Sequence, residues 1–213
     1  MTGNDYHVDA DTLSPDPRTD IKDPLERIIS RIIDDLSPED YALNAVLILL
    51  FNHIDLLGNL LSSDSSKANQ AKLAVNFIRL YLGKVDEKYA MAGGFIYYML
   101  GNGLIHESFP RSFNTGDGKM LRVTFSNTQE TQKHLSVTQS GDELELMFSV
   151  TLFYKDLLDA IELYCLDMSR DKPLLDKCQQ AWRLLKEPED RTKIRNHAYI
   201  LESDFGFIND QIL

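Results

Sequence analysis

Cysteine is scarce in this chain: Cys165 and Cys178 are the only two among 213 residues. Two cysteines cannot build the disulfide framework that stabilises small secreted domains, and this pair lacks the spacing of a zinc site. Both lie on the apolar sides of helical patterns, where a free thiol behaves as a small hydrophobic side chain. We therefore expect two buried free thiols rather than a redox or metal centre.

Long hydrophobic runs are also absent. The longest unbroken apolar run extends only from Ala45 to Phe51, whereas a membrane-spanning helix needs about twenty apolar residues. The first twenty residues lack the basic start and the apolar core of a secretory signal. We expect a cytoplasmic protein that does not associate with membranes.

Positive charge is in deficit, with 22 Lys and Arg against 33 Asp and Glu and a net charge of −11. This balance disfavours broad electrostatic capture of a nucleic acid, because phosphates are drawn to positive fields, and it leaves room only for a small local basic site. No Gly-rich phosphate loop follows a strand, and no nucleophile elbow occurs. The spacing of the five histidines nominates no metal site, so we expect neither a cofactor nor a metal.

Helical periodicity, by contrast, runs through most of the chain, and 43% hydrophobic residues can supply a core. Residues 1–22 are acidic and poor in apolar side chains, which indicates a disordered acidic arm. The run Asp23-Pro24-Leu25-Glu26 combines a capping residue, a first-turn proline and a capping-box carboxylate, and so predicts the start of the first helix. We expect a single helical domain over 23–213.

Further helices are predicted from apolar spacing over about 38–62, 66–82, 86–105 and 151–186, and the last of these ranges contains two helices, the second of which opens at Asp171-Lys172-Pro173. Between the last two of these ranges, hydrophobic side chains alternate with period two in Leu121–Phe125 and Glu143–Phe148, which is typical of strands. We expect a mainly α protein. It should be a helical bundle of five to seven helices with a small antiparallel β-hairpin insert of two or three strands at about 119–150.

The helix predicted over 38–62 carries a polar stripe. At about 100° per residue, four polar residues fall on one side of it, namely Asn44, Asn52, Asp55 and Asn59. His53 lies on the other side. A polar stripe on an otherwise apolar helix is either a solvated edge or the wall of a site, and the sequence leaves both interpretations open.

The helix predicted over 86–105 is rich in glycine, which weakens a helix by about 1 kcal/mol per residue. Its glycines are Gly93, Gly94, Gly101 and Gly103. They indicate tight packing or a backbone kept clear for a partner, and they predict a kink or a frayed end near Gly101-Asn102-Gly103.

This helix end, Gly101 to Glu107, resembles the HEPN family (higher eukaryote and prokaryote nucleotide-binding domains). The family signature is an arginine, often followed by a polar residue, with a histidine four to six positions after the arginine at the end of a core helix. Asn102 matches the polar position and His106 the catalytic histidine, whereas Gly101 stands in the place of the arginine. The resemblance covers about residues 38–110 and, more loosely, the helices at 151–186.

The resemblance implies a metal-independent ribonuclease, or a degenerate relative that binds RNA or a nucleotide, in a bacterial defence or toxin–antitoxin system. In such a site imidazole handles the proton of the 2′-hydroxyl or leaving group, and guanidinium stabilises charge on the phosphate. With Gly101 in the arginine position the cation must come from elsewhere. Arg79, Lys84 and Arg111 are candidates, and we take Arg79 and Arg111 as substrate-binding. Family members usually pair these helices, which implies a homodimer through 86–105.

Other interpretations stay open. His106 can be a helix-terminal histidine that contacts the last carbonyls of its helix. A second string with similar spacing, from Arg191 to His197, follows a turn near the C-terminus. The whole chain can also be a non-catalytic interaction module, whose acidic surface and apolar stretch at 205–213 bind a protein partner.

Overall fold

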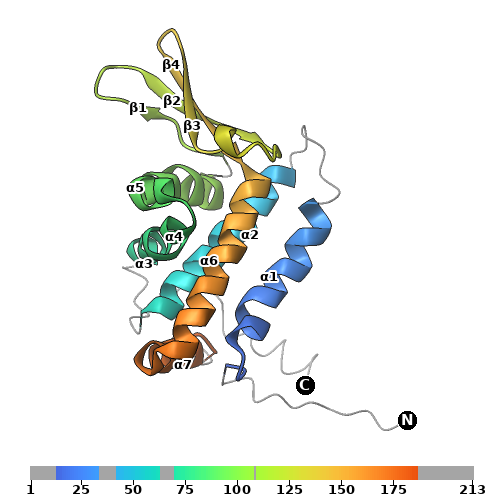
Figure 1. Cartoon of the computed structure of the whole chain (residues 1–213). Helices are drawn as coiled ribbons and strands as arrows, with labels where there is room; N and C mark the ends of the chain where they lie inside the picture. The colour runs from blue at the N-terminus through green and yellow to red at the C-terminus, as the bar shows by residue number, and fades with distance from the viewer. Residues whose placement is uncertain (1–12, 34–41, 63–69, 108, 187–213) are drawn as a thin grey trace, which may run out of the picture.

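The computed structural model of the chain describes residues 13–33, 42–62, 70–107 and 109–186. Helices form a bundle, and a small sheet lies at one end of it (Figure 1). The helices are α1 Pro17–Ile33, α2 Ala42–Leu61, α3 Gln70–Phe77, η2 Ile78–Leu82, α4 Gly83–Val85, α5 Glu87–Ile96, η3 Tyr97–Glu107, η4 Thr131–Lys133, α6 Val150–Arg170 and α7 Lys172–Lys186. The expected mainly α protein with a β-insert is confirmed. The Arg191–His197 string and the stretch at 205–213 lie outside the described residues.

Helix α2 is central to the bundle. Its apolar side chains Val46, Leu50, Ile54 and Leu57 are fully buried, and it contacts α1, α3, α6, α7 and η3. By length and composition alone Leu43–Leu61 could cross a bilayer, yet 56% of that stretch is buried inside the protein. The apolar side chains of α2 therefore pack in the core, as the sequence pattern predicts for a central helix.

Helix α1 begins at Pro17 rather than at Asp23, so the expected solvated arm is wrong for residues 13–22. Residues 1–12 lie outside the described part of the chain. Leu13 and Ile21 are buried, and Arg18 reaches Glu162 of α6, with 2.6 Å between Nη2 and Oε1. Pro17 takes the first helical position, where a missing N–H is tolerated. Burial of these apolar side chains outweighs the start signal further along.

The sheet is mixed and four-stranded, which corrects the expected antiparallel hairpin. Its strands are β1 Phe113–Asn114, β2 Met120–Ser126, β3 Ser136–Ser140 and β4 Glu143–Ser149, in the order β1-β2-β4-β3. β3 and β4 form an antiparallel hairpin, but β4 pairs with β2 in parallel. β4 takes the inner place because it carries Leu146 and Phe148, which are buried, whereas β3 is polar and suits an edge.

The two cysteines are free and buried, as the sequence predicts. Burial raises the pKa of the Cys165 thiol to about 12 and that of the Cys178 thiol to about 11. A thiol is a nucleophile or metal ligand only when it is deprotonated. Both therefore act as apolar side chains of the core.

A buried hydrogen-bond chain joins the sheet to the bundle through His134, which is 3% exposed. The backbone N–H of Ser149 donates to His134 Nδ1 at 2.9 Å, so the proton of the neutral ring must sit on Nε2. Nε2 then donates to Tyr89 Oη at 2.7 Å, and the Tyr89 hydroxyl donates to Asp156 Oδ2 at 2.8 Å. The sequence of donors fixes the tautomer, and burial lowers the pKa of His134 to about 4.

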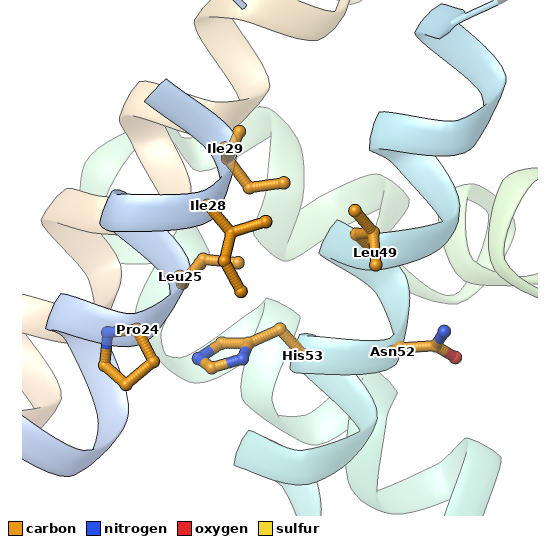
Figure 2. Close-up of a pocket in the computed structure, with 7 residues that line it drawn as sticks. All are labelled: Pro24, Leu25, Ile28, Ile29, Leu49, Asn52 and His53. Atoms are coloured by element: carbon orange, nitrogen blue, oxygen red, sulfur yellow. The ribbon is translucent and has the colours of Figure 1, made fainter. Parts of the chain in front are cut away.

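A second histidine lies half-buried between helices. His53 of α2 points toward α1, beside Pro24 (Figure 2), and lines an apolar pocket of about 220 Å³ with Leu25, Ile28 and Leu49. Burial lowers its pKa to about 4, while a hydrogen bond with the backbone of Ile21 acts in the opposite direction. Both histidines are therefore neutral in the folded protein at neutral pH.

We predict that acid weakens the fold through His53 and His134. A group with a folded pKa of about 4, against 6.5 in the unfolded chain, contributes stability that is present above pH 6.5 and is lost as the pH falls toward 4. Two such groups should lower the free energy of unfolding by about 3 kcal/mol between pH 7 and pH 5. Urea unfolding at the two pH values measures this decrease.

Two carboxyls act in the opposite direction. Burial raises the pKa of Asp55 and of Asp156. Their protonation therefore adds to the free energy of unfolding as the pH falls, and it offsets part of the loss caused by the two histidines at the acidic end of the range. The variant His53→Leu removes one titrating group and should show about half of the wild-type decrease. An equal decrease in both proteins would contradict the role of His53, and no decrease in either would contradict the whole mechanism.

Candidate functional site

The candidate histidine lies on a π-helix. α5 continues directly into η3, which is wound as a π-helix of 11 residues from Tyr97 to Glu107. Gly101-Asn102-Gly103 lie inside it, so the kink or frayed end expected there is a change of winding instead. π-helices are rare, are mostly a single turn long and frequently occur at functional sites. This winding singles out the helix end that carries Asn102 and His106.

The winding decides which side chains share a face. Hydrogen bonds from i to i+5 give between four and five residues per turn, so residues nine apart lie about two turns apart on one face. At 3.6 residues per turn, nine residues make two and a half turns and end on opposite faces. Tyr97 and His106 are nine apart, and so are Tyr98 and Glu107. The π-helix therefore creates two pairs that an α-helix would separate.

Asp55 of α2 lies against the first pair. The Tyr97 hydroxyl donates to Asp55 Oδ1 at 2.6 Å. Burial raises the pKa of the Asp55 carboxyl, and the Tyr97 hydrogen bond and the charge of a protonated His106 oppose that rise. A carboxylate and a phenol thus come together from two helices, and His106 lies near enough for its charge to act on the carboxylate. Asp55 belongs to the polar stripe, and here the stripe is the wall of a site, whereas Asn52 is exposed.

Arg111 lies against the second pair. Its Nε and Nη2 donate to Glu107 Oε1 at 3.0 and 2.5 Å, and its guanidinium carbon is 4.8 Å from the centre of the Tyr98 ring. Its backbone N–H donates to the carbonyl of Met99 at 3.0 Å, which ties the segment after η3 back onto the helix. We refer to Asp55, Tyr97, Tyr98, His106, Glu107 and Arg111 as the His106 site.

Gly103 allows the backbone of residues 109–111 to pass close to η3. A Cβ atom at this position would lie 2.7 Å from the carbonyl oxygen of Phe109 and 2.8 Å from the backbone nitrogen of Arg111. Only glycine leaves enough space for the two backbones to pass so closely. Gly103, which the sequence associates with tight packing, therefore allows Arg111 to lie beside the end of η3 that carries His106 and Glu107.

Gly101 stands where the family signature has its arginine, and at this position there is no space for a long side chain. It is buried, and a Cβ atom there would lie 3.1 Å from Phe51 Cδ1 and 3.1 Å from Tyr97 Cδ2. The position faces the interior between α2 and η3 rather than solvent. A guanidinium attached at this point would enter the packed rings, so the cation of the site has to come from another part of the chain.

The other sequence candidates lie in different places. Asn102 is half-buried on η3. Arg79 of η2 packs beside Gly94 of α5, with its Nη2 3.5 Å from the position of a Cβ atom there, which is about three helical turns before His106. Lys84 pairs with Asp167 of α6, with 2.8 Å between Nζ and Oδ2. The structure thus brings Arg111 to the helix end that carries His106, and it places Arg79 and Lys84 elsewhere.

Sequence reasoning did not connect Asp55 and Tyr97 with His106. The polar stripe of α2 includes Asp55, but apolar periodicity does not reveal the π winding that places Tyr97 and His106 on one face of η3. His106 and Glu107 are exposed, so the site is open to a ligand. Among the described residues no three His, Cys, Asp or Glu side chains gather where they could hold a metal ion.

Comparison with known proteins adds no family assignment. No family model, no curated protein and no solved structure matches the chain. The function of the His106 site must therefore be argued from its own residues.

Proposed function

We propose that this chain is a HEPN-like protein that binds RNA or a nucleotide through a phosphate group at the His106 site. It is a degenerate relative of the ribonucleases of that family and acts in the cytoplasm, in a defence or toxin–antitoxin setting. One observation carries the proposal: the π-helix ends in the exposed side chains of His106 and Glu107, and Arg111 joins this helix end through its ion pair with Glu107.

The chemistry of these side chains suits a phosphate. A guanidinium offers two parallel N–H donors to phosphate oxygens, and Arg111 already uses its Nε and Nη2 in this way on Glu107. The exposed imidazole of His106 carries a ring N–H that can donate a further hydrogen bond. The exposed ring of Tyr98 offers an aromatic surface to a base.

The buried Gly101 supports binding over cleavage. Ribonuclease chemistry needs a cation on the phosphate as charge develops, together with a group that moves a proton. Arg111 is held by Glu107, and the arginine position of the signature is occupied by core packing. A site with one engaged guanidinium can hold a phosphate, but it stabilises a developing charge less well than a dedicated arginine beside the histidine.

We predict that a short single-stranded RNA binds weakly and through few charges. Two cations at most face the phosphate, so log K should fall with log salt with a slope of about −1.4 or less steep, at about −0.7 per neutralised phosphate. Arg111→Ala and His106→Ala should each weaken binding about tenfold, because each removes a hydrogen-bond donor to the phosphate. Fluorescence anisotropy with a labelled oligonucleotide at low salt measures both effects.

Arg79→Ala is the matched control, because it removes an exposed arginine that lies away from the His106 site. It should bind as the wild type does, and Glu107→Gln should bind several-fold more tightly because Arg111 is released. Wild type should not cleave the oligonucleotide. A loss with Arg79→Ala as large as that with Arg111→Ala would contradict the site, and no binding by any variant would leave the interaction module as the function of the chain.

A further inference from the structure

A polar pocket lies where the helical bundle meets the sheet. It has a volume of about 380 Å³ and is formed by the end of α1, the segment after β2 and the first turns of α6. Its polar lining residues are Ser30, Asn127, Gln129, Thr151 and Lys155. The volume falls in the range of small-molecule sites, about 300–1,000 Å³, and the pocket shares no residue with the His106 site.

The packing of α1 against α6 sets two walls of this pocket. Arg18, near the start of α1, pairs with Glu162 of α6. Ser30 follows Arg18 by twelve residues, and Thr151 precedes Glu162 by eleven. At 1.5 Å per residue these stretches of helix have nearly the same length, so two antiparallel helices joined at Arg18 and Glu162 bring Ser30 to the level of Thr151.

The residue before α6 fixes the third wall. The Ser149 hydroxyl donates to the carbonyl of Thr128 at 2.5 Å, and it accepts from the backbone N–H of Leu152 at 3.2 Å. One side chain therefore caps the helix and also ties down the segment that carries Asn127 and Gln129. The pocket is part of the fold, because its walls are joined by hydrogen bonds and helix packing.

Thr151 places a buried hydroxyl in the pocket. The residue is 6% exposed and lines the cavity, yet no described residue forms a hydrogen bond with its hydroxyl. Buried polar groups in proteins nearly always have a partner, and one that lacks it destabilises the fold. The hydroxyl of Thr151 therefore marks a place where a ligand atom can complete the hydrogen bonding.

The charge around this hydroxyl is positive. The first N–H groups of a long helix have no acceptor within the helix and carry partial positive charge, and Ser149 satisfies only that of Leu152 among them through its side chain. Lys155, about one turn further along α6, also lines the pocket and forms no ion pair with a described carboxylate. No Asp or Glu lines the cavity, although the chain has 33 of them. The pocket therefore suits an anion.

We propose that this pocket binds a small phosphate monoester that carries hydroxyl groups, such as a sugar phosphate. The phosphate lies at the first turn of α6, where the helix end, the Thr151 hydroxyl and the Lys155 ammonium offer donors to its oxygens. The amides of Asn127 and Gln129 offer both donors and acceptors, which is what hydroxyl groups need. Tyr154 lines the pocket but is 7% exposed, so its ring has no open face on which a base could stack.

Titration calorimetry in a phosphate-free buffer of low salt tests the site. Glucose 6-phosphate should bind with a dissociation constant of about 0.3 mM, the affinity that a usual efficiency per atom gives to a ligand of this size. Inorganic phosphate and glucose each make only part of the contacts, and each should bind at least about tenfold more weakly. No binding of glucose 6-phosphate at about 10 mM, or equal affinity for glucose and for either phosphate, overturns the proposal.

Two variants identify the groups that hold the phosphate. Lys155→Gln and Thr151→Val should each weaken the binding of glucose 6-phosphate about tenfold, because each removes a donor to a charged oxygen. Thr151→Val should also melt at or above the wild-type temperature, since it removes a buried hydroxyl that has no hydrogen bond in the protein alone. A Thr151→Val protein that melts well below the wild type would show that the hydroxyl has a partner within the fold, and would contradict the site.

Two further variants separate this pocket from the rest of the surface. Lys177→Gln removes an exposed lysine of α7, and Arg111→Ala removes the guanidinium of the His106 site. Both should bind glucose 6-phosphate as the wild type does, and Lys155→Gln should in turn bind the RNA oligonucleotide as the wild type does. A loss of glucose 6-phosphate binding with Arg111→Ala as large as that with Lys155→Gln would place the phosphate at the His106 site and overturn the proposal.

Discussion

Replacing Gly58 by alanine is expected to destabilise the protein by about 3 kcal/mol or more, which is the upper end of the range for overpacked cores. A Cβ atom at Gly58 would lie 2.6 Å from the Ala74 nitrogen, 2.6 Å from the Leu73 carbonyl carbon and 2.8 Å from the Leu73 oxygen. All three atoms belong to the backbone of α3, so no side chain can rotate away. The gain in helix propensity from glycine to alanine, about 1 kcal/mol, is too small to compensate for separating α2 from α3.

Gly94→Ala is the matched control for this prediction. It makes the same exchange in a helix, but its nearest neighbours, Arg79 Nη2 at 3.5 Å and Val75 Cγ1 at 3.8 Å, are at ordinary contact distance. It should therefore raise the free energy of unfolding by about 0.5–1 kcal/mol. Melting curves should separate the two variants by about 10 °C. A Gly58→Ala protein as stable as the wild type would mean that α2 and α3 pack less closely than the structure describes.

The helical part of the fold could be predicted because burial imposes a period on the sequence. The stripe Leu25, Ile29 and the fully buried residues of α2 follow that period, and the structure has helices at these places. The start of α1 could not be read in the same way. A capping box at Asp23 is a local signal, and the contact of Arg18 with Glu162, 144 residues away along the chain, is not visible from the neighbouring sequence.

The positions of the strands could also be predicted from the local sequence, whereas their order in the sheet could not. Period-two alternation correctly places β2 and β4, but it does not say which strands are neighbours. The parallel register that sets Leu121 against Leu144 and Phe125 against Phe148 depends on which strand has the more apolar face to bury. β4 has it, and so it displaces β3 to the edge.

The site was the least predictable part, because it depends on the winding of one helix. Helix propensities and apolar spacing describe α-helices, and they place Tyr97 and His106 on opposite faces. The π winding reverses this, and it also makes the contact of Asp55 with Tyr97 relevant to His106. The family resemblance points to the helix end that carries His106, and it suggests that an arginine at position 101 would complete the signature.

Gly101→Arg is the change that tests this suggestion, and we expect it to destabilise the protein strongly rather than to create a ribonuclease. Gly101 is buried, and the first side-chain atom would already lie 3.1 Å from Phe51 Cδ1. The guanidinium would then be enclosed by aromatic rings without a carboxylate to pair with it, which costs several kcal/mol. Helix propensity favours arginine over glycine by less than about 1 kcal/mol, so the loss dominates and the melting temperature should fall by about 10 °C or more.

Asn102→Arg is the control that separates the effect of the buried position from the effect of the arginine side chain itself. It introduces the same guanidinium one residue further along η3, at a half-buried side chain from which a long arginine can reach solvent, and it should change stability by no more than about 0.5 kcal/mol. Gly101→Ala, with only the Cβ atom, should lie near the wild type, because the propensity gain offsets a contact that ring edges can relieve by small shifts. A folded Gly101→Arg that cleaves RNA would show that Phe51 and Tyr97 can open to admit the side chain, and the arginine position of the family signature would then be available in this chain after all.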